Sequence, residues 1–248
     1  MNLTEFKLFS EKEQSLPDVS SLPSQYLLKS LLLKVLRKIS HDPKSRMVWT
    51  VSAVSDAHDH TATVRNYLDQ RTIRQILADL TQKSKIERAC EVGCGYGRVI
   101  MVLKEFADYV KGFERESHLV EIARTLQPDI EFECVHSLLE ITEKVPYDFV
   151  MTCTVLQHLT DQEARQVCSV LRALAPKGHI LLIEKTDPFN ITDNIEDGAR
   201  FISRARSVEM YSEYMLPYNL LMTLDRVVEP TYPNPKPGKC MLFASPQS

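Results

Sequence analysis

The stretch from Ile86 to Glu116 constrains the fold of this chain more than any other. A short apolar run at 89–92 leads into the glycine loop Gly93-Cys94-Gly95-Tyr96-Gly97, and a second apolar run ends at Glu114. Alternate glycines after a strand let the backbone turn sharply and approach a ligand closely, because they carry no Cβ. An acidic residue at the end of the next strand is placed to accept hydrogen bonds from a ribose diol. The stretch therefore predicts a nucleoside-binding site on an α/β sheet.

Alternating apolar strands and amphipathic helices continue after this stretch to about residue 184. We expect strands at 89–92, 109–113, 130–134, 147–153 and 179–183, with helices at 99–106, 119–126 and 161–174 between them. Repeated strand–helix units of this kind form a parallel sheet with helices on both faces and right-handed crossovers. After it we expect a helix at 197–215 and two closing strands at 220–228 and 240–244, with a proline-rich loop between the strands.

Two helices are expected before the sheet, at 25–39 and 63–80, because apolar residues recur there at helical spacing. The first helix packs on its own domain, forms a contact in a homodimer or lies on a membrane surface; the sequence leaves these alternatives open. We divide the chain into N-terminal accessory or lid helices at 1–80 and a main domain at 81–248. Within the main domain, 185–217 is an insert on the substrate side.

The composition is that of an ordinary globular protein, and it narrows the classes of partner. A formal net charge of −3 and a pI near 6.2 offer no electrostatic basis for binding nucleic acid. The six cysteines show neither CxxC pairing nor zinc-ligand spacing, so we expect reduced thiols and no metal. No apolar stretch approaches the roughly 20 residues of a membrane span, and the N-terminus lacks the pattern of a signal peptide. We expect a cytoplasmic protein.

The spacing of the glycines separates the classes of ligand. A dinucleotide-binding G-x-G-x-x-G that starts at Gly93 would need its third glycine at position 98, where this chain has Arg98. This disfavours a nicotinamide-dependent oxidoreductase. A phosphate-binding P-loop would need Gly-Lys-Ser/Thr, which is absent from the loop. The glycines therefore favour a nucleoside without a pyrophosphate.

The sequence Glu91-Val92-Gly93-Cys94-Gly95-Tyr96-Gly97, with Glu114 ending the next strand, resembles motif I of the class I S-adenosylmethionine-dependent methyltransferases. Tyr147-Asp148-Phe149-Val150 and the turn at 174–179 resemble later motifs of that family. The resemblance covers about 86–184 and implies S-adenosylmethionine as cofactor. It also implies a doubly wound, mostly parallel seven-stranded sheet whose last strand is antiparallel.

The resemblance further implies roles for individual residues. Glu91 and the backbone at Gly93 and Gly95 are expected beside the methionine part of the cofactor, and Glu114 at the ribose. Cys94 and Arg98, in the same loop, are also expected to bind the cofactor. Arg115 and the segment His136-Ser137-Leu138 are expected near the adenine. Many members of the family have an acidic residue just after the third strand, which this chain lacks. The segment 152–158, from Thr152 to His158, is expected to line the family's methyl-transfer pocket. Tyr67 and Arg71, one helical turn apart, are expected to reach the cofactor's carboxylate.

We expect an enzyme that transfers a methyl group to an oxygen or nitrogen nucleophile of a small-molecule acceptor. A hydroxyl or ammonium acceptor needs a base to remove its proton. The candidates, in order, are His158, His58, His60 and Glu184. His158 follows the predicted fourth strand. His58 and His60 lie in the short segment Asp56-Ala57-His58-Asp59-His60 before the second helix.

Two other functions stay open. The segment 157–161, Gln-His-Leu-Thr-Asp, with the insert that follows strand five, is weakly similar to protein N-terminal amine methyltransferases. A peptide amine would need an acidic groove, for which the insert offers Asp187, Asp193, Glu196 and Asp197. A non-catalytic nucleotide-binding module is the other alternative. The insert also carries Arg200, Arg204 and Arg206, which form either a solvated face or a clamp for an anionic substrate.

Overall fold

The computed structural model describes residues 60–187, 189, 192–195, 201–226 and 238–247. The predicted helix at 25–39 and the residue His58 lie outside these ranges, as do Glu196, Asp197 and Arg200 of the insert.

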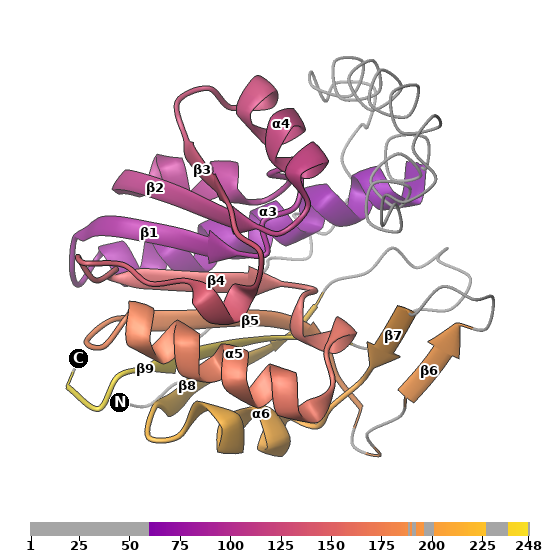
Figure 1. Cartoon of the computed structure of the whole chain (residues 1–248). Coiled ribbons are helices and arrows are strands. Elements are labelled where there is room, and N and C mark those ends of the chain that lie inside the picture. The colour runs from indigo at the N-terminus through magenta and orange to yellow at the C-terminus, as the bar shows by residue number, and fades with distance from the viewer. Residues whose placement is uncertain (1–59, 188, 190–191, 196–200, 227–237, 248) are drawn as a thin grey trace, which may run out of the picture.

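Seven strands form the central sheet, in the order β3-β2-β1-β4-β5-β9-β8 (Figure 1). Their bounds are β1 Ile86–Val92, β2 Ala107–Glu114, β3 Glu131–Cys134, β4 Phe149–Cys153, β5 His179–Lys185, β8 Asn219–Asp225 and β9 Gly238–Ala244. The neighbours from β3 to β5 all pair in parallel, whereas β9 is antiparallel to both β5 and β8. This is the predicted doubly wound sheet with an antiparallel last strand.

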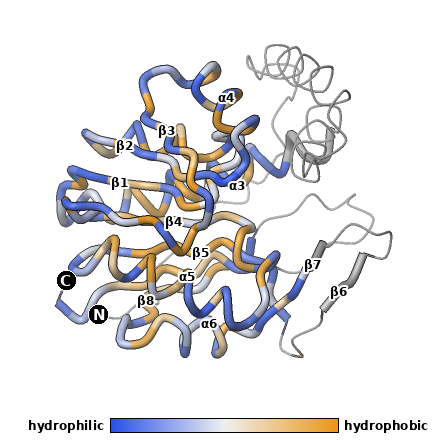
Figure 2. The backbone as a smooth tube through the Cα atoms, in the orientation of Figure 1, coloured by the Kyte–Doolittle hydropathy of each residue, from blue (hydrophilic) through white to orange (hydrophobic). Residues whose placement is uncertain are grey.

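Helices cover both faces of the sheet, and each layer has its own apolar core. On one face pack α3 His60–Thr81, the 3-10 helix η3 Ile100–Glu105 and α4 Ser117–Leu126; on the other pack α5 Asp161–Leu174 and α6 Val208–Met215. Successive strand residues alternate between the two cores, so that Ala89 belongs to the first and Cys90 to the second. Figure 2 shows the resulting pattern, with hydrophobic strands inside and helices that are hydrophilic on their outer sides.

The prediction of one helix at 197–215 was wrong. The described part of this segment contains a strand, β7 Phe201–Arg204, which pairs antiparallel with β6 Thr192–Ile195, and only then the shorter helix α6. The side chain of Ser207 caps α6 by accepting a hydrogen bond from the Met210 amide, which places the helix start at Val208. Pairing with the strand just before it, which helical spacing does not reveal, decided the structure of the first half of this segment.

The β6–β7 hairpin lies beyond the end of the central sheet (Figure 1). It leaves the sheet where β5 ends, and Thr186 forms a bridge with Arg206 at its base. The insert therefore projects from the carboxyl edge of the parallel strands, which is the edge where α/β proteins bind their ligands.

Candidate active site

The glycine loop after β1 has the backbone that its sequence predicts. Gly93, Gly95 and Gly97 all have positive φ angles, of 75°, 58° and 84°. A Cβ on Gly93 would come within 2.5 Å of a methyl group of Val155, so the loop and the segment after β4 are in close contact. A Cβ on Gly95 would meet nothing within 4 Å. The loop therefore presents bare backbone to open space at Gly95.

Glu114 ends β2 directly beside this loop. One of its carboxylate oxygens accepts a hydrogen bond from the Gly95 amide at 2.8 Å, and the other accepts from the amides of Arg115 at 2.7 Å and Glu116 at 2.9 Å. Burial raises the pKa of Glu114, and the three amides act in the opposite direction. A carboxylate has about four acceptor positions, so Glu114 retains capacity for one more donor, such as a ribose hydroxyl.

Glu91 lies near the carboxyl end of β1, two residues before the first glycine. Only 2% of the residue is exposed, and its buried Oε2 atom has no hydrogen-bond partner. Burial raises the pKa of Glu91 to about 8, although Arg98 acts to lower it. A buried acceptor without a partner costs about 1–3 kcal/mol. A ligand that brings a donor to this atom would remove that cost, which is what the ammonium group of a bound amino acid supplies.

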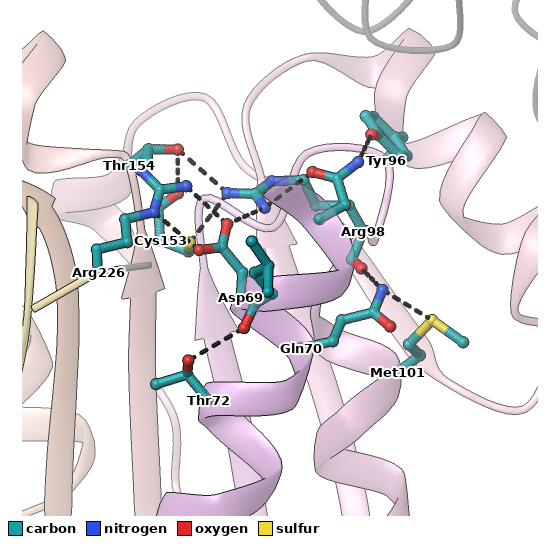
Figure 3. Close-up of polar contacts among 11 residues, drawn as sticks. Asp69, Gln70, Thr72, Tyr96, Arg98, Met101, Cys153, Thr154 and Arg226 are labelled. Carbon is teal, nitrogen blue, oxygen red and sulfur yellow. Dashed lines mark hydrogen bonds and ion pairs between the residues drawn. The ribbon is translucent and has the colours of Figure 1, made fainter. Parts of the chain in front are cut away.

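A buried ion cluster stands next to the loop (Figure 3). Arg98 donates to Asp69 at 2.7 Å, and Arg226 donates to both oxygens of the same carboxylate at 2.8 and 2.6 Å. Arg98 also donates to the sulfur of Cys153 at 3.0 Å. Burial acts to raise the pKa of Asp69, but the two arginines prevail and hold it at about 2. With one carboxylate for two guanidinium groups, this cluster carries a net positive charge close to Glu91.

Sequence reasoning missed Asp69 and Arg226, which lie 157 positions apart on α3 and just after β8. It expected α3 to act through Tyr67 and Arg71. α3 contacts the loop through Asp69 and its neighbours: Asn66 donates to the Tyr96 hydroxyl at 3.2 Å, and Gln70 donates to the Arg98 carbonyl at 2.6 Å. Tyr67 and Arg71 are half-buried on the same helix, and their contact with the cofactor stays a prediction.

The segment after β4 closes the site from the other side. Thr154 has a φ of 59°, a left-handed conformation that is rare for a β-branched residue. Strain of this kind costs on the order of 1–3 kcal/mol and concentrates at functional sites. The 3-10 helix η5 Leu156–His158 begins directly afterwards. It carries the predicted base His158 at the carboxyl edge of the sheet.

Two further predicted residues lie under this turn. Glu184, in β5, is fully buried and accepts hydrogen bonds from the amides of Val155 and Leu156, both at 3.0 Å, and Gln157 at 3.1 Å. Its fourth donor is the hydroxyl of Thr152, at 3.1 Å. The two side chains thus bind each other, and Glu184 also binds the backbone of the turn. This geometry suits support of the turn better than the predicted contacts with acceptor or cofactor, which stay untested.

The residues predicted near the adenine surround the end of β3. The Val135 amide donates to the carbonyl of Glu114, which brings the segment that follows close to the ribose side of the site. His136 is exposed, the hydroxyl of Ser137 caps the 3-10 helix η4 Leu138–Glu140, and Leu138 packs against the second core. Arg115 is 43% exposed and forms an ion pair with Glu116 at 3.4 Å. These side chains lie at the correct edge, and their contacts with the cofactor stay a prediction.

The described residues also bear on metal binding and on membrane spans. Among the described residues, no group of three or more histidine, cysteine or acidic side chains is arranged to hold a metal ion. None of the helices in the described ranges is both long and apolar enough to cross a membrane.

Residues 90–182 match the family model of the methyltransferase domain. No curated protein matches the chain by sequence. Many solved structures share the fold, and three of them are compared with this chain. Magnesium protoporphyrin IX methyltransferase from Synechocystis PCC 6803, solved with S-adenosylmethionine bound, is 14% identical, with a TM-score of 0.59 over 91% of this chain and 99% of that one. A methyltransferase of the DUF858 family from Leishmania major is 21% identical, with a TM-score of 0.61 over 86% and 82%.

The third structure is the N-methyltransferase NodS from Bradyrhizobium japonicum in complex with S-adenosylhomocysteine. It is 14% identical, with a TM-score of 0.56 over 87% of this chain and 98% of that one. Identities this low show the fold, while the match over 90–182 shows the domain. The glycine loop, the open space at Gly95 and the unpaired carboxyl of Glu91 suit the cofactor that these proteins bind. Residues 90–182 are thus a methyltransferase domain, and the chain has the fold of known S-adenosylmethionine-dependent methyltransferases.

Proposed function

We propose that this enzyme transfers a methyl group to an oxygen or nitrogen nucleophile of a small-molecule acceptor. The observation that carries the proposal is the turn after β4, where Thr154 is in a left-handed conformation and His158 follows at the carboxyl edge of the sheet. The glycine loop lies against the same segment through Gly93 and Val155. Cofactor and acceptor would therefore meet between these two segments.

In this proposal the cofactor is held by groups that the fold has already aligned. Glu91 receives the ammonium group, the backbone at Gly93 and Gly95 lies along the methionine part, and Glu114 accepts from the ribose. When bound, S-adenosylmethionine supplies an electrophilic methyl group on a sulfonium, whose departure needs no acid. The protein then has to align the nucleophile with that methyl group and exclude water.

In this proposal His158 is the base that removes the proton from the acceptor. The Lys185 amide donates to Gln157 Oε1 at 3.1 Å, which orients the side-chain amide of Gln157. Its Nε2 atom therefore donates to Nε2 of His158, 3.0 Å away. In the neutral ring this places the proton on Nδ1 and leaves Nε2 as the acceptor atom. An acceptor hydroxyl or amine that replaces the Gln157 donor would give its proton to Nε2.

The test is a transfer assay with methyl-tritiated S-adenosylmethionine against a metabolite pool and, separately, a peptide pool. His158→Ala should lower turnover by roughly 10²- to 10⁴-fold, while the Kd for S-adenosylhomocysteine stays within about threefold, or ~0.65 kcal/mol. His179→Asn is the matched control, because His179 starts β5 at the opposite edge of the sheet. Unchanged turnover in His158→Ala would remove the residue from this role.

A protein or peptide amine is the second candidate for the acceptor. It is supported by Arg204 and Arg206, which both pair with Asp161. Since both cations are paired with a carboxylate and Arg206 is buried, the insert is less suited to clamp an anion than sequence reasoning allowed. Asp187, at the base of the insert, would contribute to an acidic groove. Label in the peptide pool alone would favour this acceptor.

Label in neither pool, with S-adenosylhomocysteine still bound, would favour the non-catalytic module. We propose no oligomeric state from the fold. Mass photometry of the purified chain would test the homodimer.

A further inference from the structure

The turn at 155–159 is held at both of its ends by buried charges. At its beginning, three successive backbone amides point at the carboxylate of Glu184. At its end, the guanidinium of Arg206 donates to the carbonyl of Leu156 at 2.7 Å and to the carbonyl of Leu159 at 2.6 Å. An anion at the amide end and a cation at the carbonyl end both match the dipole of a helical turn.

Arg206 is completely buried, with none of its surface exposed. Its third donor, Nε, binds Asp161 at 2.8 Å, at the first residue of α5. Three hydrogen bonds of this guanidinium therefore go to the segment 156–161, and Tyr211 of α6 also interacts with it. A planar group with several fixed donors suits such a site better than the single charge of a lysine.

The backbone of Arg206 lies at the base of the insert. Its carbonyl accepts a hydrogen bond from the Asp187 amide at 3.2 Å, and it forms a bridge with Thr186 just after β5. One residue thus joins the end of β5, the return strand of the β6–β7 hairpin and the turn that carries His158. The sequence allowed two interpretations of this arginine, as part of a solvated face or of a clamp for an anionic substrate. Its complete burial excludes the solvated face.

We propose that Glu184 and Arg206 are positioning residues that clamp the turn 155–159 from its two ends. The clamp holds the ring of His158 at the methyl-transfer site, and Arg206 couples its position to the base of the insert. The inference rests on the proposed function only in taking His158 as the residue that faces the acceptor. In this proposal both residues act through the turn and contact neither acceptor nor cofactor.

The experiment compares Arg206→Met with Arg204→Met in the full chain, with no acceptor needed. Arg204 is the matched control because it pairs with the other oxygen of Asp161 at 2.5 Å. Three quantities are measured: hydrogen exchange of the amides at 155–159, the tautomer of His158 from ¹⁵N-histidine spectra, and the Kd for S-adenosylhomocysteine. His158→Gln assigns the His158 signal.

Arg206→Met removes the guanidinium donor from two carbonyls of the turn, of which that of Leu156 keeps only the Leu159 amide, so exchange at 155–159 should rise by roughly tenfold or more. The His158 nitrogen shifts should move toward the average of the two tautomers, while the Kd changes by less than about threefold, or ~0.65 kcal/mol. Arg204→Met should leave the exchange and the tautomer as in the wild type. A merely structural arginine would raise exchange throughout the sheet and leave the His158 tautomer unchanged.

The clamp is refuted if Arg206→Met and Arg204→Met give the same local exchange and the same His158 spectrum. If Arg206→Met does not fold, Arg206→Lys and Arg204→Lys replace the pair. Lysine keeps the charge but not the paired donors, so Arg206→Lys should show the same local changes in smaller measure, and no difference between the two lysine variants would again refute it. A wild-type protein that does not bind S-adenosylhomocysteine would argue against the proposed cofactor site, not against the clamp.

Discussion

Glu91→Gln tests whether the free enzyme keeps an unpaired carboxyl group under its cofactor loop. Burial raises the pKa of Glu91 from 4.5 to about 8; Arg98 opposes the rise, and Glu114 and Asp69 add to it. Since one pKa unit is worth about 1.36 kcal/mol, the fold disfavours the ionised carboxylate by about 5 kcal/mol.

The direction of the pH dependence follows from the raised pKa. Below about pH 4.5 both the folded and the unfolded state hold the proton, and the full stability is present. As the pH rises to about 8, only the unfolded chain releases the proton, so the free energy of unfolding falls. Glutamine does not titrate. The stability of Glu91→Gln relative to wild type should therefore grow by up to about 5 kcal/mol across this window and stay constant above it.

The assay is urea unfolding of the ligand-free protein from about pH 5 to about pH 9. Glu87→Gln is the control, because Glu87 is exposed on the same strand, and its stability relative to wild type should not vary in this way. A difference between Glu91→Gln and wild type that is independent of pH would refute the reasoning.

The same group predicts a proton linked to cofactor binding. An ammonium group placed at Glu91 favours the carboxylate, so S-adenosylhomocysteine should displace close to one proton from the wild type at about pH 7 and none from Glu91→Gln. Calorimetry in buffers of different ionisation enthalpy measures this number. Equal proton release by both proteins would mean that the proton comes from another group.

Three further changes test other parts of the site. Asp69→Asn leaves Arg98 and Arg226 without a buried carboxylate and should lower the free energy of unfolding by about 3–5 kcal/mol, measured in urea near pH 7; a loss below about 1 kcal/mol would show that the cluster contributes little. Thr154→Asn places a residue that tolerates positive φ in the strained position and should raise stability by about 1 kcal/mol; a lower Tm would mean that the threonine side chain outweighs the strain. Glu114→Gln should weaken S-adenosylhomocysteine binding by roughly tenfold or more, or ~1.4 kcal/mol, and unchanged affinity would exclude the ribose contact.

The parallel sheet and the loop that binds the cofactor could be predicted from the sequence because their signals are local. Strands and helices repeat at short intervals, and the glycines at 93, 95 and 97 mark backbone conformations that few other residues adopt. Glu114 follows at the end of the next strand, and parallel pairing brings it to the loop without any further information. The fold class and the edge of the candidate site follow from these patterns, whereas the cofactor was implied by the resemblance of the loop to motif I of the methyltransferases.

The partners of the charged side chains were decided by the tertiary structure alone. Asp69 and Arg226 meet across 157 positions, and Arg206 is buried against a turn that lies about 50 positions earlier in the chain. From the sequence alone, an arginine at helical spacing is interpreted as solvent-exposed, because the sequence does not show which carbonyls will lack a donor after folding. For the same reason, the strand at 201–204 looked helical until its pairing with 192–195 was known. Local patterns thus indicated which edge of the sheet carries the candidate site, whereas contacts between distant segments decided what holds its residues in place.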